Sequence, residues 1–265
     1  FAAARQAAVQ ALCPGADIAA LLDKPNNNLA VEYCKAIIEQ NVEMQPIALP
    51  RQGADHGQAL TESAHAAFAS ASALRALWAE GGAAALAPYV PEKALKLYKQ
   101  AEYDGKYTDF AVMGHCELAL LRAACAGQAP FAAVRGVSEG LEHRLENAVR
   151  ETASLPTLLD ALTTVRYPRA RMRRLAMDAA LGYTAQTPAL PPYLHLLGAR
   201  KEALSLPGET ALPLSHSLAR LARENESCAQ MAAAQSRASD LGALCRAKPE
   251  PMGGIYRQKI IFLTN

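Results

Sequence analysis

The sequence predicts a mostly α-helical protein with a small α/β piece at its N-terminal end. From residue 70 onward, apolar residues recur at helical spacing almost to the end of the chain. Before that point, the short apolar stretch MQPIAL at 44–49 has the length of a strand. Gly81, Gly82 and Pro91 interrupt the helical pattern. We therefore expect a first domain at residues 1–82 and a helical domain at 83–265.

The first domain is expected to hold helices on either side of the strand. Residues 1–12 are rich in alanine, and Cys13-Pro14-Gly15 ends this helix because proline cannot continue it. A second helix is expected at 29–40, with an asparagine of the preceding run as its N-cap. The polar, glycine-containing residues 51–61 indicate a loop, and a further helix follows at 70–80.

Capping residues and prolines divide the second domain into further helices. The expected N-terminal residues of these helices are Pro91, Thr108 or Asp109, Ser138, Ser154 and Pro168. Two more helices are expected at 209–222 and 224–245. Short extended pieces are expected at 191–198 and 257–263.

Composition limits the classes of function. Of the 265 residues, 51% are apolar and 20% are charged, which supplies a core and argues against a disordered chain. The net charge is only +2, so any basic surface must come from local clustering. No apolar run approaches the ~20 residues that span a bilayer, and we expect a soluble, cytoplasmic protein without a membrane partner. The cysteines and histidines lack metal-ligand spacing, so we assign no metal-site residues. The sequence also contains no P-loop and no GxSxG motif.

The densest charge cluster lies at 166–174. It contains five arginines and no acid: Arg166, Arg169, Arg171, Arg173 and Arg174. Three of them, at positions 166, 169 and 173, share one face if the first turn is already helical. Guanidinium groups bind phosphate bidentately, and Tyr167 beside them can stack on a base. The cluster therefore favours contact with phosphate or RNA.

The same arginines have a structural alternative. Their aliphatic stems can cover apolar surface while the guanidinium groups pair with acids of the preceding helix. Those acids are Glu139, Glu142 and Glu146. From spacing alone, both interpretations stay open.

Three further positions are candidate anion sites. Asn26, in the KPNNN run before a helix, can contact a nucleotide near free backbone N–H groups, or the run can simply cap the helix. Arg51 follows the expected strand, where open α/β sheets bind ligands, or is an ordinary surface residue. Ser70 and Ser72, with Arg75 one turn on, can hold phosphates, or the serines can act as caps.

Six segments in this order resemble the bacterial tRNA(Met) cytidine acetate ligase family, which is related to the HxGH nucleotidyltransferases. They are KPNNNLAVEY (24–33), PIALPR (46–51), SASALR (70–75), SEGLEHRL (138–145), RYPRARMRR (166–174) and PPYLHLLGAR (191–200). The resemblance implies that residues 1–82 are part of a Rossmann-like nucleotidyltransferase domain and that 83–265 form an α-helical tRNA-binding domain. It covers nearly the whole chain.

The resemblance also implies an activity. Such enzymes use ATP, with Mg²⁺, to activate acetate as acetyl-adenylate and then acetylate N4 of the wobble cytidine of elongator tRNA(Met). By position, ATP-contacting roles fall to Asn26, Arg51, Ser70, Ser72 and Arg75. The arginines of 166–174 are the candidate tRNA contacts.

One departure from the family is the missing HxGH motif, whose histidines face the triphosphate. Gly114-His115 lies in an expected helix far downstream. We therefore expect the chain alone to lack ligase activity and leave the catalytic residues unassigned. The alternatives are a non-catalytic RNA-binding module on the same scaffold and a small-molecule nucleotidyltransferase, which would not need the arginine cluster.

Overall fold

The computed structural model describes residues 2–14, 21–22, 25–49, 69–202 and 210–263. The chain forms two compact units, Phe1–Ala73 and Leu74–Asn265. The described residues are mainly helical, which confirms the predicted mostly-α class. None of the helices in these ranges is both long and apolar enough to cross a bilayer. The functional assignment of domains at 1–82 and 83–265 stays a prediction.

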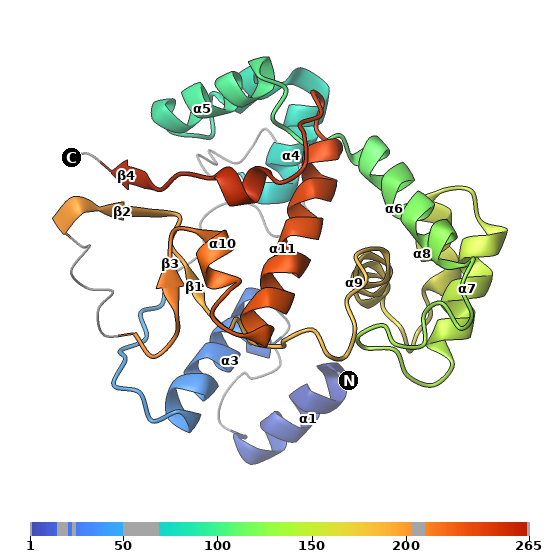
Figure 1. Cartoon of the computed structure of the whole chain (residues 1–265). Helices are drawn as coiled ribbons and strands as arrows, with labels where there is room; N and C mark the ends of the chain where they lie inside the picture. Colours follow the sequence, from blue (N-terminus) through green and yellow to red (C-terminus); the bar gives the residue numbers. More distant parts are fainter. Residues whose placement is uncertain (1, 15–20, 23–24, 50–68, 203–209, 264–265) are drawn as a thin grey trace. The chain divides into compact units, whose positions relative to one another are not determined.

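The first unit contains α1 (Ala2–Leu12), α3 (Pro25–Glu39) and the start of α4 (Ala71–Gly81), which Figure 1 colours blue to cyan. The Arg5 guanidinium joins α1 to α3 by an ion pair with Glu32 at 2.9 Å. The predicted asparagine N-cap of α3 is wrong, because the helix already begins at its proline. Proline suits a first helical position since the N–H it lacks would have no partner there.

The strand expected at 44–49 is not present. These residues have no helix or strand assignment, and no strand among the described residues pairs with them. The side chains of Met44, Ile47 and Leu49 are 62%, 81% and 88% exposed. A strand needs a neighbour to satisfy its backbone groups, and an apolar stretch alone does not supply one.

The second unit continues α4 and adds seven α-helices and two 3₁₀ turns within its described residues. These are η1 (Ala83–Leu86), α5 (Glu92–Tyr103), α6 (Phe110–Ala124), α7 (Leu141–Glu151), α8 (Leu155–Leu162), α9 (Arg169–Ala180), α10 (Leu218–Leu221), α11 (Glu226–Leu244) and η3 (Gly254–Arg257). Its strands are β1 (Leu194–His195), β2 (Gly198–Arg200), β3 (Leu214–Ser215) and β4 (Ile261–Leu263).

The main core of the second unit lies among α6, α7, α8 and α9. Helix α6 contacts the other three, and α8 contacts both α7 and α9, as the green-to-yellow helices of Figure 1 show. The apolar side chains between them are fully buried, among them Leu121, Leu145, Leu158, Leu162 and Met172. Burial of each such side chain contributes about 1.5–3 kcal/mol relative to exposure. This bundle fixes the walls of the cleft described below.

Two of the predicted caps are confirmed in this bundle. Asp109 Oδ1 accepts from the backbone N–H of Ala111 at 2.9 Å, and Ser154 Oγ accepts from that of Thr157 at 3.3 Å. These contacts satisfy N–H groups that the first helical turn leaves without partners. They begin α6 and α8, the helices that form two walls of the cleft.

The predicted cap at Ser138 is wrong. Helix α7 begins at Leu141, and Gly140 is its N-cap with φ of 81°. Glu139 also has a positive φ of 57°, so two left-handed residues in succession form a turn before the helix. Glycine adopts this conformation without steric cost, and the turn leaves Ser138 outside the helix.

The extended pieces expected at 191–198 and 257–263 contribute to two small parallel pairs, β1 with β3 and β2 with β4. The helix expected at 209–222 is largely wrong. Within its described residues, β3 occupies 214–215, and only α10 is helical. Pro213 accounts for the difference, because it lacks a backbone N–H and disfavours helical geometry in the residue before it.

Candidate functional site

The asparagine run occupies the first turn of α3. The Asn27 amide donates to the Leu21 carbonyl at 3.0 Å, and the Asn28 amide donates to the Leu22 carbonyl at 2.7 Å. These two side chains therefore hold the segment that precedes the helix. The Asn26 side chain is exposed and makes no hydrogen bond to any described residue. Of the three, Asn26 is the one whose amide is available to a ligand.

The serines at the start of α4 have a structural role. Ser70 Oγ accepts from the backbone N–H of Ala73 at 3.2 Å and lies 3.0 Å from Ser72 Oγ. Ser70 is only 4% exposed, so the serine cap, one of the two alternatives, is confirmed. Arg75 is exposed one turn further along α4, in the second unit. Arg51 lies outside the described residues, and the ATP-contacting roles of these positions stay predictions.

The arginine segment begins with two arginines that are paired to acids. Arg166 lies before α9 and pairs with Glu139 at 2.5 Å, while Arg169, the first residue of α9, pairs with Asp160. Because α9 begins at Arg169, the predicted common face of positions 166, 169 and 173 is wrong. The proline directly before α9 starts the helix, so Arg166 is not part of it.

The segment ends with two arginines that are not paired. Arg173 and Arg174 are exposed on α9, and neither forms an ion pair or a hydrogen bond with another described residue. Arg171 differs again, because its guanidinium carbon lies 5.1 Å from the centroid of the Tyr167 ring. A phosphate that binds Arg173 or Arg174 has no protein ion pair to displace.

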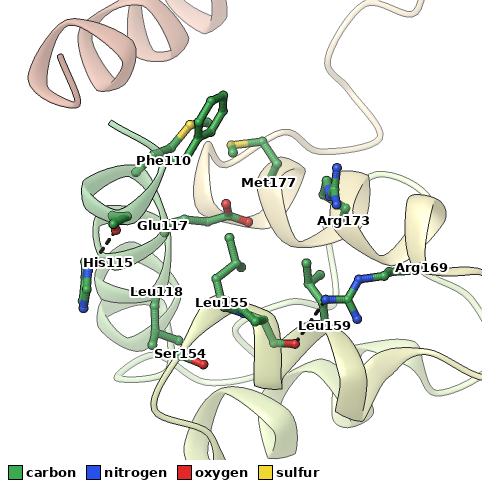
Figure 2. Close-up of a pocket in the computed structure, with 14 residues that line it drawn as sticks. Phe110, His115, Glu117, Leu118, Ser154, Leu155, Leu159, Arg169, Arg173 and Met177 are labelled. Carbon is green, nitrogen blue, oxygen red and sulfur yellow. Dashed lines mark hydrogen bonds between the residues drawn. The ribbon is translucent and has the colours of Figure 1, made fainter. Parts of the chain in front are cut away.

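A cleft of about 520 Å³ lies between α6, α8 and α9, a volume within the range of small-molecule sites. Figure 2 shows Glu117 extending from α6 into the space between these helices. Met177 and Arg173 of α9 lie on the other side, and Leu155 of α8 lies below. Most of the remaining lining is apolar, with Phe110 among it. The cleft thus combines an apolar wall, one carboxyl group and an unpaired guanidinium group.

Glu117 is the buried acid of this cleft. The residue is 1% exposed, and its Oε1 atom has no hydrogen-bond partner in the part of the chain that the structure describes. Burial raises the pKa of the Glu117 carboxyl from 4.5 to about 7, against the opposing effect of the positive charge on Arg173. The charged form loses its hydration in this environment, which is why the carboxyl holds its proton more tightly. Such a group in a cleft is a candidate functional residue.

The sequence reasoning missed Glu117, although a signal for it exists. Glu117 lies four residues from both Met113 and Leu121, so it interrupts the apolar face of an expected helix. A charged residue at such a position is either exposed, because the helix packs differently there, or buried for a reason that the apolar pattern does not give.

Among the described residues, no cluster of three or more His, Cys, Asp or Glu side chains is arranged to hold a metal ion.

Comparison with protein families matches residues 1–253 to the HIGH Nucleotidyl Transferase family. A tRNA(Met) cytidine acetate ligase of Listeria monocytogenes is 30% identical over 183 residues, which cover 68% of this chain and 45% of the relative. The ligase of the same name from a Geobacillus strain is 28% identical over 185 residues, covering 67% and 45% of the two chains. The chain therefore spans about half the length of the curated relatives it matches.

Two solved structures share the fold. Thermotoga maritima TmcAL bound with alpha-thio ATP has a TM-score of 0.81 at 21% identity, covering 100% of this chain and 67% of that one. The apo form of the same protein has a TM-score of 0.77, also at 21% identity, covering 92% and 62%. At this level of identity the likeness shows the fold. The relatives and the fold agree with the family resemblance drawn from the sequence.

Proposed function

This chain belongs to the HIGH nucleotidyl transferase family, and we propose that it forms part of an ATP-dependent ligase that acetylates a cytidine of elongator tRNA(Met). The family match over residues 1–253 supports the nucleotidyl transferase chemistry, and the relatives named tRNA(Met) cytidine acetate ligase support the substrate. In the proposed reaction, an acetate oxygen attacks the α-phosphorus of ATP, pyrophosphate leaves and acetyl-adenylate forms. The N4 amine of the wobble cytidine then attacks the acetyl carbon, losing a proton, and AMP leaves.

The residues proposed to contact ATP act on the charge of the phosphates. Transfer of the adenylyl group increases the negative charge on the α-phosphate and on the departing pyrophosphate. Arg51 and Arg75 supply positive charge, and the Ser72 hydroxyl, which lies 3.0 Å from the capping hydroxyl of Ser70, supplies a donor. Asn26 supplies a side-chain amide that forms no hydrogen bond with any described residue. Mg²⁺, proposed to accompany ATP, would neutralise part of the same charge.

The proposed RNA contacts are Arg173 and Arg174. Both guanidinium groups are exposed and unpaired among the described residues, so phosphate oxygens can bind them directly. Arg166 and Arg169 are engaged by Glu139 and Asp160 and contribute less. A basic surface of this kind contributes to RNA affinity through the phosphates, whatever the sequence of bases.

The test is the affinity of the chain for fluorescently labelled elongator tRNA(Met), measured by anisotropy at fixed salt. We expect the Arg173→Gln/Arg174→Gln variant to bind about tenfold more weakly, since two phosphate contacts are lost. The matched control is Arg166→Gln/Arg169→Gln, which removes the same charge and should change affinity by about threefold or less. Absence of tRNA binding by the unsubstituted chain would contradict the proposed RNA partner.

ATP binding is tested separately, by calorimetric titration of the chain with ATP. Asn26→Ala should weaken ATP binding by several-fold, as expected for loss of about 1 kcal/mol from one hydrogen bond. Asn27→Ala is the control, because the Asn27 amide already donates to a backbone carbonyl. Equal effects of the two substitutions would contradict the role proposed for Asn26.

A further inference from the structure

We propose that the cleft between α6, α8 and α9 binds an unstacked guanine of an RNA, with the Glu117 carboxylate accepting from the base and Arg173 contacting a phosphate. This inference rests on the proposed function, which makes RNA the partner of the chain. It gives a role to a cleft that contains none of the residues proposed to bind ATP.

The Glu117 carboxyl in this cleft is not satisfied by the protein. Glu117 is 1% exposed, lines the cleft and has an Oε1 atom without a hydrogen-bond partner among the described residues. Leaving a buried polar atom unpaired costs stability, so buried polar groups are nearly always satisfied. Figure 2 shows the side chain directed into the space between the three helices. A ligand that brings N–H donors into this space would satisfy it.

Among the RNA bases, guanine carries the N–H donors that fit this carboxyl. Guanine carries N1–H and its 2-amino group side by side on one edge, and these donate to the two oxygens of a single carboxylate. The corresponding edges of adenine, cytosine and uracil place an acceptor beside every donor. An ionised carboxylate facing those edges therefore meets a lone pair with at least one of its oxygens. Guanine is therefore the base that matches the ionised Glu117 carboxylate, the form that predominates above its pKa of about 7.

The rest of the cleft offers an aromatic ring, flexible apolar side chains and a positive charge. Phe110 lines it and is 73% exposed, so its ring face is available for stacking on a base. Met113 and Met177 also line it, and methionine side chains adapt readily to the shape of a ligand. Arg173 lines the cleft from α9, is exposed and has no ion-pair or hydrogen-bond partner among the described residues. A planar base that stacks by its face and carries a phosphate fits these three features together.

The proposal is tested by nuclear magnetic resonance on the chain labelled with ¹³C-methyl methionine. Titration with guanosine 5′-monophosphate should shift the methyl signals of Met113 and Met177, while those of Met231 and Met252 stay in place. Inosine monophosphate, which lacks the 2-amino group, should bind about tenfold more weakly. The monophosphates of adenosine, cytidine and uridine should bind more weakly still.

Substitutions then assign the contacts. Glu117→Gln should weaken guanosine monophosphate binding by at least about tenfold, because the amide offers one acceptor in place of two. Glu151→Gln makes the same chemical change at an exposed position outside the cleft and should have no effect. Arg173→Gln should weaken binding of guanosine monophosphate but not that of guanosine, which has no phosphate.

Four results distinguish failure of this inference from failure of the proposed function. No saturable shift of Met113 or Met177 with guanosine monophosphate would overturn the inference, as would equal binding of all four nucleotides. Binding of tRNA that is unchanged in Glu117→Gln would also overturn it and leave the proposed function standing. Guanosine monophosphate binding in the cleft without any tRNA binding would support the pocket chemistry and contradict the proposed function instead.

Discussion

The polar side chains at the starts of α3 and α4 and those of the α6–α8–α9 cleft are used in opposite ways. Asn27, Asn28 and Ser70 all hydrogen-bond to the backbone close by in the sequence. In the cleft, the Glu117 Oε1 atom and the Arg173 guanidinium have no hydrogen-bond partner among the described residues. The first group stabilises the protein by its contacts. In the second, the buried Glu117 carboxyl costs stability, the exposed Arg173 guanidinium does not, and both are available to a ligand.

Residue type alone is therefore a weak guide to function in these two regions. Asparagine and serine before a helix satisfy free backbone N–H groups or carbonyls, and this accounts for most of what these residues do here. A buried acid cannot be explained in that way, because it costs free energy in the fold. The residues with unsatisfied groups are therefore the stronger functional candidates.

The largest expected effect is on Glu117. Its pKa is 4.5 when exposed and about 7 in the folded protein, so the unfolded chain releases this proton first as pH rises. Stability is therefore unaffected by Glu117 below pH 4.5 and falls between about pH 4.5 and 7, by about 3 kcal/mol in total. Glu117→Gln should remove this fall and raise the free energy of unfolding by a similar amount at pH 8.

Urea denaturation at a series of pH values measures this effect. The control is Glu151→Gln, which should leave both the stability and its pH dependence unchanged, because Glu151 is exposed. A Glu117→Gln variant that is less stable than the unsubstituted chain at pH 8 would mean that the carboxyl has a stabilising partner. That result would remove the contrast between the two regions.

A smaller effect is expected at the start of α4. Ser70→Ala should lower the free energy of unfolding by about 1 kcal/mol, because the backbone N–H of Ala73 loses its acceptor. Ser72→Ala should cost less than about 0.5 kcal/mol, since its hydroxyl contacts only the other serine in the described structure. Chemical denaturation of the two variants distinguishes them. Equal losses would show that Ser70 is not the cap.

An effect of similar size is expected in the asparagine run. Asn28→Ala should cost about 1 kcal/mol through loss of its bond to the Leu22 carbonyl. Asn26→Ala should change stability by less than about 0.5 kcal/mol, since its side chain is exposed. Both substitutions alter the same helical turn, so their difference measures what the contacts of the Asn28 side chain contribute. A larger loss at Asn26 would contradict the view that its amide is left to a ligand.

Local patterns in the sequence predict the helices well. The helical spacing of apolar residues and the caps at Asp109 and Ser154 depend on neighbours within one turn, so the chain alone reveals them. The predictions of a strand at 44–49 and of a cap at Ser138 are wrong for different reasons. A strand depends on a distant partner, and the cap was displaced by two left-handed residues, Glu139 and Gly140.

The site was less predictable than the fold. The acids that engage Arg166 and Arg169 come from separate segments, so the sequence cannot tell paired arginines from unpaired ones. The apolar spacing of α6 shows only that an acid interrupts it; the burial of Glu117 depends on the packing of α8 and α9 against α6, which local sequence does not specify. The predicted alternative of pairing with Glu139 was right for one arginine and does not describe Arg173 or Arg174.

The salt dependence of tRNA binding tests most directly whether the unpaired arginines form the RNA contact. Loss of two arginine–phosphate contacts should make the negative slope of log affinity against log salt shallower by about 1.5. We predict that reduction for Arg173→Gln/Arg174→Gln and an unchanged slope for Arg166→Gln/Arg169→Gln. An unchanged slope in the first variant, or a larger reduction in the second, would contradict the account.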